Sequence, residues 1–420
     1  MKRDGHKVGD NRNPIWQRVR KSHAFRPVAF FLFGYLLLAQ VLSLFGIAGG
    51  LAGRADFKQL YAAGYMVRTG HAHEIFNYQA TARYEHELVG PVGAVLPYNH
   101  PSYEALLLAP LSIFSYKVAY LLFFCVNTLV MFLVFLLLRP YLTGYAELWK
   151  PLIYAPFLCF FPVQIALVQG QDSIFLLATI VCAFRLEESK RDFWAGFTLA
   201  FGLFKFQFVL PIALLFLLWK RWRLVSGFAS GAIIWGAVSL AVTGLDSWRT
   251  YGSYLLSMSA NLTPNGSEMY GILPERMANL RGVVSGTVGA LAPRLVVQAT
   301  VAIASLLLIL WAARKRCSFA LAALVAFLVS YHAYPHDQVV IVLALALAAI
   351  TARTASGLLL ASCAFVIATP TVAMLTGMPF WLVGIPILVF TYETGTCAVS
   401  GGHELLSDQA SCRTSLGTQA

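Results

Sequence analysis

Residues 117–138 read KVAYLLFFCVNTLVMFLVFLLL, an apolar run that follows the single charge of Lys117 and is interrupted only by Asn127 and Thr128. A helix needs about 20 such residues to cross the hydrocarbon core of a bilayer. A second run of this length covers 28–49, and the whole chain is 58% hydrophobic and only 12% charged. Soluble domains are usually about 25% charged. The sequence therefore predicts an integral membrane protein built from helices.

Apolar runs recur along the chain and predict an all-α, polytopic bundle of about twelve transmembrane helices. After the first two, they lie near 151–168, 173–186, 193–204, 208–219, 224–243, 295–313, 318–331, 338–351, 355–375 and 379–393. The 193–204 and 208–219 runs are too short to cross a bilayer alone, which predicts a broken helix pair or a re-entrant hairpin. A single crossing over 193–219 is rejected, because it would put the Trp-Lys-Arg-Trp-Arg stretch at 219–223 outside.

The basic residues orient this bundle. Of the 31 Lys and Arg residues, 21 lie in the predicted cytoplasmic tails and turns, although the outside segments are longer. By the positive-inside rule, both termini are cytoplasmic and the protein lies in the plasma (inner) membrane. The net charge of +12 therefore reports topology and not nucleic-acid binding. The first run exceeds the 7–15 residues of a signal peptide core, so it is predicted to stay uncleaved.

The same reasoning divides the chain into three parts. A basic cytoplasmic tail covers 1–27, a transmembrane domain covers 28–393, and a disordered cytoplasmic tail covers 394–420. Within the domain, two large extracytoplasmic loops are predicted at 50–116 and 244–294. The seven cysteines form no metal or disulfide pattern.

Polar chemistry gathers on the predicted outer face. Besides the two large loops, three short turns hold ionisable or amide side chains: Gln171 and Asp172, Lys205, and His332, His336 and Asp337. Ionisable groups at membrane depth are costly and usually functional. An acid, a cation and imidazoles at the lipid–water boundary suit a substrate that is half lipid and half polar.

Each candidate also has a plainer interpretation. Asp56 suits the N-cap of a helix that begins at 57, and Gln171 and Asp172 suit the cap of the next helix. Lys205 could extend to the membrane interface while its stem stays in lipid. The His332–Asp337 turn could simply join two spans, and Pro335 argues against a metal site between its two histidines. Trp248, Tyr251 and Tyr254 are typical of an interfacial aromatic belt.

Short motifs in a fixed order resemble glycosyltransferase family 87 over roughly 50–350. They are Asp56-Phe57-x3-Tyr61-x-Ala63-Gly64-x5-Gly70, Tyr98-Asn-His-Pro101, Ala109-Pro-Leu111, Gly170-Gln171, Ala195-Gly196 with Gly202 and Lys205, and Ser330-x-His332-x-Tyr334-x-His336-Asp337. The chain departs from the family pattern at Asp172, where Asn is commoner, and at Asn99-His100, where a Pro-containing pair is more usual.

This resemblance implies a GT-C membrane fold and an α-mannosyltransferase that uses a polyprenyl-phosphate donor. It implies Asp56 as the general base that activates an acceptor hydroxyl. The leaving lipid phosphate needs fixed cations or donors, and the candidates are Lys205, Arg281, His332 and His336. Further substrate-binding candidates are Tyr61, Tyr98, Gln171, Asp172 and Asp337.

The predicted reaction is an inverting transfer of a sugar, most simply mannose, to a lipid or glycan acceptor. Inversion needs one carboxylate base and no second nucleophilic carboxylate. A single phosphate can be held by side chains and no Asp-x-Asp motif occurs, so no metal and no cofactor are predicted. The predicted partners are the donor, the acceptor and membrane lipids.

Two other classes of protein stay open at this point. A lipid or glycolipid transporter or flippase without catalytic activity would usually show repeated halves and charges in the middle of its spans. The sequence shows neither. A structural or assembly membrane protein is the second alternative. The large outer loop, with a carboxylate directly after the first helix, favours an enzyme over both.

Overall fold

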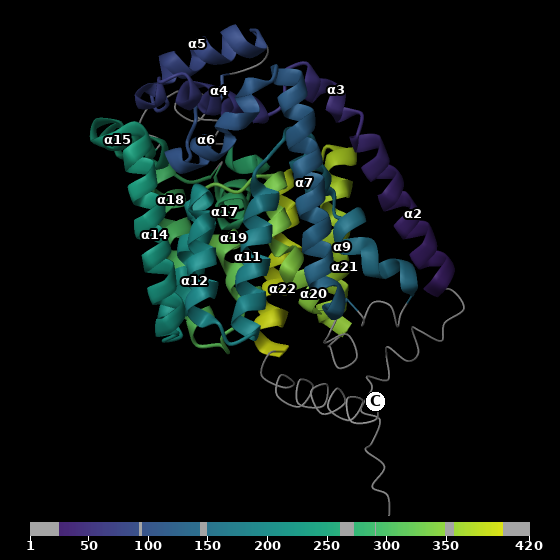
Figure 1. Ribbon diagram of the computed structural model, residues 1–420. Coiled ribbons are helices and arrows are strands. Elements are labelled where there is room, and N and C mark those ends of the chain that lie inside the picture. Colours follow the sequence, from purple (N-terminus) through teal and green to yellow (C-terminus); the bar gives the residue numbers. More distant parts are fainter. Residues whose placement is uncertain are drawn as a thin grey trace, which may run out of the picture.

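The computed structural model describes residues 25–91, 95–142, 149–260, 273–289, 291–348 and 357–397. These residues form helices and connecting turns, and no strand occurs among them, which confirms the predicted all-α class. Figure 1 shows most helices aligned in one bundle, with several shorter helices lying across one end of it. The predicted tails, apart from 25–27 and 394–397, lie outside the described residues.

The bundle is built from long helices and from shorter ones that pack beside them. They are α2 (Phe25–Ser43), α7 (Tyr116–Leu138), α10 (Phe161–Gln169), α11 (Ser173–Glu188), α12 (Asp192–Phe201), α13 (Phe206–Leu218), α14 (Trp222–Thr243), α18 (Arg294–Ala313), α19 (Phe319–Val329), α20 (Val342–Ala348), α21 (Gly357–Thr376) and α22 (Gly384–Cys397), with the 3-10 segments η3 (Arg139–Tyr141), η4 (Lys150–Tyr154), η5 (Gly202–Lys205), η7 (Pro335–Ile341) and η9 (Phe380–Val383) and the short α9 (Ala155–Leu158).

Six helical stretches of the described chain are long and apolar enough to cross a membrane. They are Tyr116–Tyr141, Lys150–Gln169, Asp192–Leu218, Trp222–Thr243, Arg294–Ala313 and Leu358–Thr376. Exposed leucines such as Leu306 and Leu307 give α18 an apolar outer surface of the kind that faces lipid. These features make the chain a membrane protein. The predicted number of about twelve spans is not confirmed, because α19 and α20, for example, are only 11 and 7 residues long.

The stretch 192–218 is not a straight rod. The backbone breaks at Lys205, whose φ and ψ are −117° and 60°. Beyond the far end of α13, an Arg221 Nη2 atom lies 3.1 Å from Asp192 Oδ2, at the first residue of α12. The chain therefore runs up α12 and returns down α13. This is the hairpin form that the sequence left open, and it puts Lys205 at the tip.

The first arm of this hairpin packs unusually closely against α14. A Cβ atom on Gly196 would lie 1.8 Å from the carbonyl oxygen of Leu224, and one on Gly227 would lie 1.9 Å from that of Phe193. Only glycine allows this approach of two backbones, the usual way in which membrane helices gain packing contacts. The two glycines thereby fix the height of Lys205 in the bundle.

The helices across the end of the bundle form a folded cap and not an open loop. The cap consists of α3 (Gly46–Leu51), α4 (Phe57–Arg68), η1 (Ala72–Glu74), α5 (Tyr78–Val89), α6 (Ser102–Leu108), η2 (Ala109–Ile113) and α15 (Leu245–Ala260). It has an aromatic core of its own, which includes Phe57, Tyr61, Tyr98, Tyr116 and Tyr251. The predicted loop 50–116 is thus mostly helical.

The second predicted loop, 244–294, contributes helices to the same end of the bundle. Besides α15, it contains η6 (Pro274–Arg276) and α17 (Leu280–Val288), while 261–272 and 290 lie outside the described residues. Tyr251 stacks on Phe76 with ring centroids 4.4 Å apart and is only 4% exposed. Tyr251 is therefore a core residue of the cap, and its predicted place in an interfacial belt was wrong.

Candidate active site

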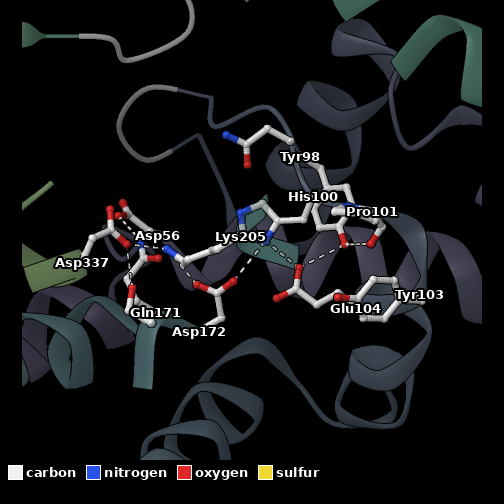
Figure 2. Close-up of polar contacts among 12 residues, drawn as sticks. Asp56, Tyr98, His100, Pro101, Tyr103, Glu104, Gln171, Asp172, Lys205 and Asp337 are labelled. Atoms are coloured by element: carbon white, nitrogen blue, oxygen red, sulfur yellow. Dashed lines mark hydrogen bonds and ion pairs between the residues drawn. The ribbon is translucent and has the colours of Figure 1, made fainter. Parts of the chain in front are cut away.

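Four chain segments meet where the cap contacts the bundle, and each brings a polar side chain (Figure 2). Asp56 directly precedes α4, the Gln171–Asp172 turn joins α10 to α11, Lys205 ends η5, and Asp337 lies in the first turn of η7. The sequence predicted this set from separate motifs. The structure brings all of them into one cluster.

A glycine makes the first of these contacts possible. Gly170 has a φ of +60°, a left-handed conformation that glycine adopts without strain. A Cβ atom there would also lie 2.7 Å from Cβ of Phe57. The turn after α10 can therefore approach the start of α4, and it carries Gln171 to Asp56.

Asp56 stands at the N-cap position of α4 but does not cap it. Its side chain makes no capping hydrogen bond. Oδ2 instead accepts a hydrogen bond of 2.5 Å from Nε2 of Gln171. The interpretation of Asp56 as a structural cap was therefore wrong. Asp172 likewise makes no capping bond to α11.

Lys205 is a buried ion-pair centre. Its side chain is only 5% exposed, and Nζ lies 2.7 Å from Oδ1 of Asp337 and 3.0 Å from Oδ1 of Asp172. Asp337 also accepts bonds from the hydroxyl of Ser173 and the backbone N–H of Tyr334. The interpretation of Lys205 as a residue that reaches the membrane interface was wrong.

A second buried pair extends this cluster into the cap. His100 Nδ1 lies 2.6 Å from Oε2 of Glu104 and 3.1 Å from Oδ2 of Asp172. Tyr98 donates its hydroxyl to the same Glu104 oxygen at 3.2 Å. Neither His100 nor Glu104 is among the site residues predicted from the sequence. The signal that could have found them is the spacing of four residues across the start of α6.

The side chains of Arg281 and His332 have fewer hydrogen-bond and ion-pair partners than the charged cluster described above. Arg281, on α17, donates from Nη1 to the carbonyl oxygen of Tyr331 at 2.9 Å. No carboxylate in the described ranges forms a salt bridge with this guanidinium. Nδ1 of His332 is buried and makes no hydrogen bond within the described structure. Both groups therefore keep donor capacity for a ligand.

Burial and neighbouring charges set the protonation states. Burial raises the pKa of Asp56, although His336 and the Gln171 hydrogen bond oppose the shift. Burial also lowers the pKa of His336 and takes that of His332 down to about 3. Near neutral pH the two imidazoles are uncharged, so they can serve as neutral hydrogen-bond donors. The raised pKa gives Asp56 more basic strength than an ordinary aspartate.

For Asp172 and Asp337, burial is outweighed by neighbouring cations. Burial alone would raise both carboxyl pKa values. Lys205 lowers them, together with His100 at Asp172, to well below the usual range for Asp172 and to about 2 for Asp337. Both carboxylates therefore stay ionised, and both are held in ion pairs.

Two of the predicted substrate-binding residues are core residues of the cap. Tyr61 is buried there and donates its hydroxyl to the carbonyl oxygen of Phe114 at 2.8 Å. Tyr98 is also buried and stacks on Phe76. Tyr98 reaches the cluster through Glu104, whereas Tyr61 is not brought to it by any hydrogen bond or salt bridge of the described residues.

Only one group of side chains in the described ranges has ligand atoms close enough to share a metal ion. It comprises His100, Glu104 and Asp172. Lys205 already supplies a cation to Asp172, and Nδ1 of His100 contacts both carboxylates, so protein groups already serve as their partners. The predicted histidine pair, His332 and His336, does not belong to this group.

Fold and site together define a helical membrane protein with a buried charged cluster at one end of its bundle. The model of glycosyltransferase family 87 matches residues 98–331, more than half of the chain. The chain therefore belongs to glycosyltransferase family 87, which confirms the resemblance seen in its motifs and indicates a glycosyltransferase. No curated protein and no solved structure matches it. Asp56 precedes the matched range.

Proposed function

We propose that the protein is an inverting glycosyltransferase that moves a sugar, most simply mannose, from a polyprenyl-phosphate donor to a lipid or glycan acceptor. The site would face the extracytoplasmic side of the plasma membrane. Family membership supports glycosyl transfer. The observation that carries the finer proposal is Asp56, a partly accessible carboxylate that is held by Gln171 and has no capping role.

In this mechanism Asp56 takes the proton of the acceptor hydroxyl as that oxygen attacks the anomeric carbon. The bond from this carbon to the phosphate oxygen breaks on the opposite face, and the configuration inverts. Retention would need a second carboxylate free to attack the sugar. Three other carboxylates lie near Asp56, and each is held in an ion pair: Lys205 engages Asp172 and Asp337 at 3.0 and 2.7 Å, and Lys58 engages Glu85 at 3.5 Å. This pairing supports inversion.

The leaving phosphate monoester gains charge as the bond breaks, and fixed donors stabilise such charge. Arg281 is the strongest candidate, because the only hydrogen bond of its guanidinium to the described residues is to a backbone carbonyl. The neutral rings of His332 and His336 are proposed to add N–H donors. Lys205 is proposed to act through its charge, since its ammonium group is shared by two carboxylates.

An apolar groove beside the charged cluster favours the proposal of a lipid-linked donor. It has a volume of about 230 Å³ and lies between the hairpin tip, α14 and α15. Its lining includes Leu203, Phe206, Trp235, Trp248 and Tyr251. Phe206 directly follows Lys205, so the groove begins beside the charged cluster. We propose that it takes the part of the isoprenoid chain nearest to the phosphate.

The test uses the purified protein in detergent with a panel of polyprenyl-phosphate sugars and a lipid extract of the cells that naturally make it. Release of polyprenyl phosphate and formation of a glycosylated product are measured, and the anomeric configuration of the product is determined. We expect transfer from the mannose donor with inversion, and loss of transfer in Asp56→Asn. Absence of transfer from every donor, or a product with retained configuration, would overturn the proposal.

A further inference from the structure

A row of five buried charged groups joins the cap to the bundle, and the mechanism above leaves two of them unused. The row begins at Glu104 and continues through His100, Asp172 and Lys205 to Asp337 (Figure 2). Successive groups are separated by 2.6, 3.1, 3.0 and 2.7 Å, and their charges alternate in sign when His100 is protonated. Each of the five residues is less than 9% exposed.

Asp172 is the junction of this row. Its Oδ2 faces His100 and its Oδ1 faces Lys205. Neither oxygen accepts any hydrogen bond from a backbone or neutral side-chain group of the described residues. Two cations, one from the cap and one from the hairpin tip, therefore fix the orientation of this carboxylate. The preceding residue, Gln171, holds Asp56.

We propose that His100 and Glu104 are positioning residues: they hold Asp172 from the cap side, so that the Gln171–Asp172 turn and Lys205 keep their places beside Asp56. This proposal rests on the proposed function for what is being positioned. It assigns His100 and Glu104 no contact with the substrate. Because a misplacement of about 1 Å can cost about 10²-fold in rate, an indirect role of this kind can still have a large effect.

The groups around His100 support a protonated ring. Glu104 faces it from α6, Asp172 faces it from the turn before α11, and the Tyr98 ring lies 5.6 Å from it. Burial lowers the pKa of His100, but the two carboxylates outweigh it and raise the pKa to about 10. Burial raises the pKa of Glu104 to about 7, with the His100 charge opposing it. Above about pH 7.5, therefore, the pair is ionised on both sides.

Substitution of Glu104 tests whether the protonated state of His100 depends on this carboxylate. In Glu104→Gln the imidazole keeps Asp172 but loses its nearest partner, so it gives up its proton at a lower pH than in the wild type. We expect wild-type kcat to be flat between pH 7.5 and 9, while kcat of Glu104→Gln falls about 10-fold or more across that interval. The double variant His100→Gln/Glu104→Gln should have low activity without that decline, because the titrating group is gone. Polyprenyl-phosphate mannose is the donor used.

A second readout does not depend on turnover. A raised pKa in the folded protein means that His100 contributes stability fully below its unfolded pKa of about 6.5, and that this contribution is lost as the pH rises toward about 10. The melting temperature in detergent should show this loss, and Glu104→Gln should shift it to lower pH. Glu188→Gln, which removes a partly buried partner of Arg185 at the opposite end of the bundle, is the matched control.

The outcomes separate the two proposals. A wild-type protein without transfer activity would end the proposed function, while the melting curves would still test the charge row. Identical melting profiles for wild type and Glu104→Gln would overturn the charge row. So would stoichiometric metal in the purified protein that disappears in His100→Gln. Shifted melting profiles with an unchanged pH profile of kcat in Glu104→Gln would overturn the positioning role.

Discussion

Gln171 and Asp56 are 115 residues apart in sequence, yet Nε2 of the first donates a hydrogen bond of 2.5 Å to Oδ2 of the second. The bond fixes the carboxylate of Asp56 and also opposes the rise of its pKa that burial causes. Its other oxygen accepts no hydrogen bond within the described part of the chain. This is the arrangement expected of a base that must stay oriented while one oxygen remains available to a substrate.

Removing the amide of Gln171 therefore has two predicted effects. In Gln171→Leu, the pKa of Asp56 rises further, so the loss of activity at low pH begins at a higher pH. A hydrogen bond to a charged group contributes about 1.5–3 kcal/mol, so we expect about a 10- to 100-fold fall in kcat. The measurement is kcat against pH. Gln169→Leu is the control, since Gln169 only accepts a weak bond of 3.4 Å from the backbone of Asp56. Equal acid limbs in both variants would contradict this role.

The second prediction concerns the leaving phosphate. Arg281→Ala removes a guanidinium that forms no salt bridge in the described part of the chain, so charge developing on the phosphate loses its best donor. Such a loss typically costs about 10²–10³ in rate. Steady-state kinetics with the mannose donor measures it. Arg249→Ala, at an exposed arginine that pairs with Asp246 in the cap, should leave the rate unchanged. Similar rates for the two variants would show that the leaving phosphate is not bound by Arg281.

The third prediction is the orientation of the bundle. A cysteine introduced at the exposed Gln79 of the cap should react with an impermeant reagent in intact cells. One at the exposed Lys190, beyond the other end of α11, should react only after the cells are opened. Both cysteines are introduced into a variant of the protein whose native cysteines have been replaced. The nearby Thr81 is unsuitable, because it is buried and bonds the carbonyl oxygen of Ile75. The reverse pattern would put the site in the cytoplasm.

Much of the architecture was predictable because it depends on local sequence. Apolar length gave the membrane helices, and the basic Trp-Lys-Arg-Trp-Arg stretch at 219–223 correctly argued against one straight crossing through Lys205. The number of membrane-spanning helices was harder to predict from the sequence. Helices such as α19 are too short to qualify by length and are held by packing on all sides, a tertiary property that composition does not encode.

Sequence motifs selected several residues of the charged cluster but not their pairings. Motif order gave Asp56, Gln171, Asp172, Lys205 and Asp337. The Asp56–Gln171 and Lys205–Asp337 contacts join residues 115 and 132 apart, and no periodicity signals them. For the same reason, the sequence predicts Lys205 only as a free cation. His100 is not predicted, because it becomes important only when the cap folds against Asp172.

The last prediction concerns the base itself. Asp56→Asn keeps the size of the side chain but replaces the carboxylate with an amide. The amide cannot take the proton from the acceptor hydroxyl. Loss of general base catalysis should lower glycosyl transfer by about 10²–10⁴-fold. Helix α4 should be unaffected, because the Asp56 side chain makes no capping bond there. The melting temperature and the affinity for the mannose donor should therefore stay close to wild type.

The raised pKa of Asp56 gives a second test of its role as the base, through the pH dependence of transfer. The wild type should lose activity on acidification at a higher pH than an ordinary aspartate would allow, since only the ionised carboxylate is active, and the residual activity of Asp56→Asn should lack this acid limb. Asp56→Glu, which keeps the carboxylate but moves it by one methylene, should fall between the two and retain a limb. Near wild-type transfer by a well-folded Asp56→Asn protein would remove Asp56 from the chemistry, and a base would then have to be sought among carboxylates that Lys205 or Lys58 already holds in ion pairs.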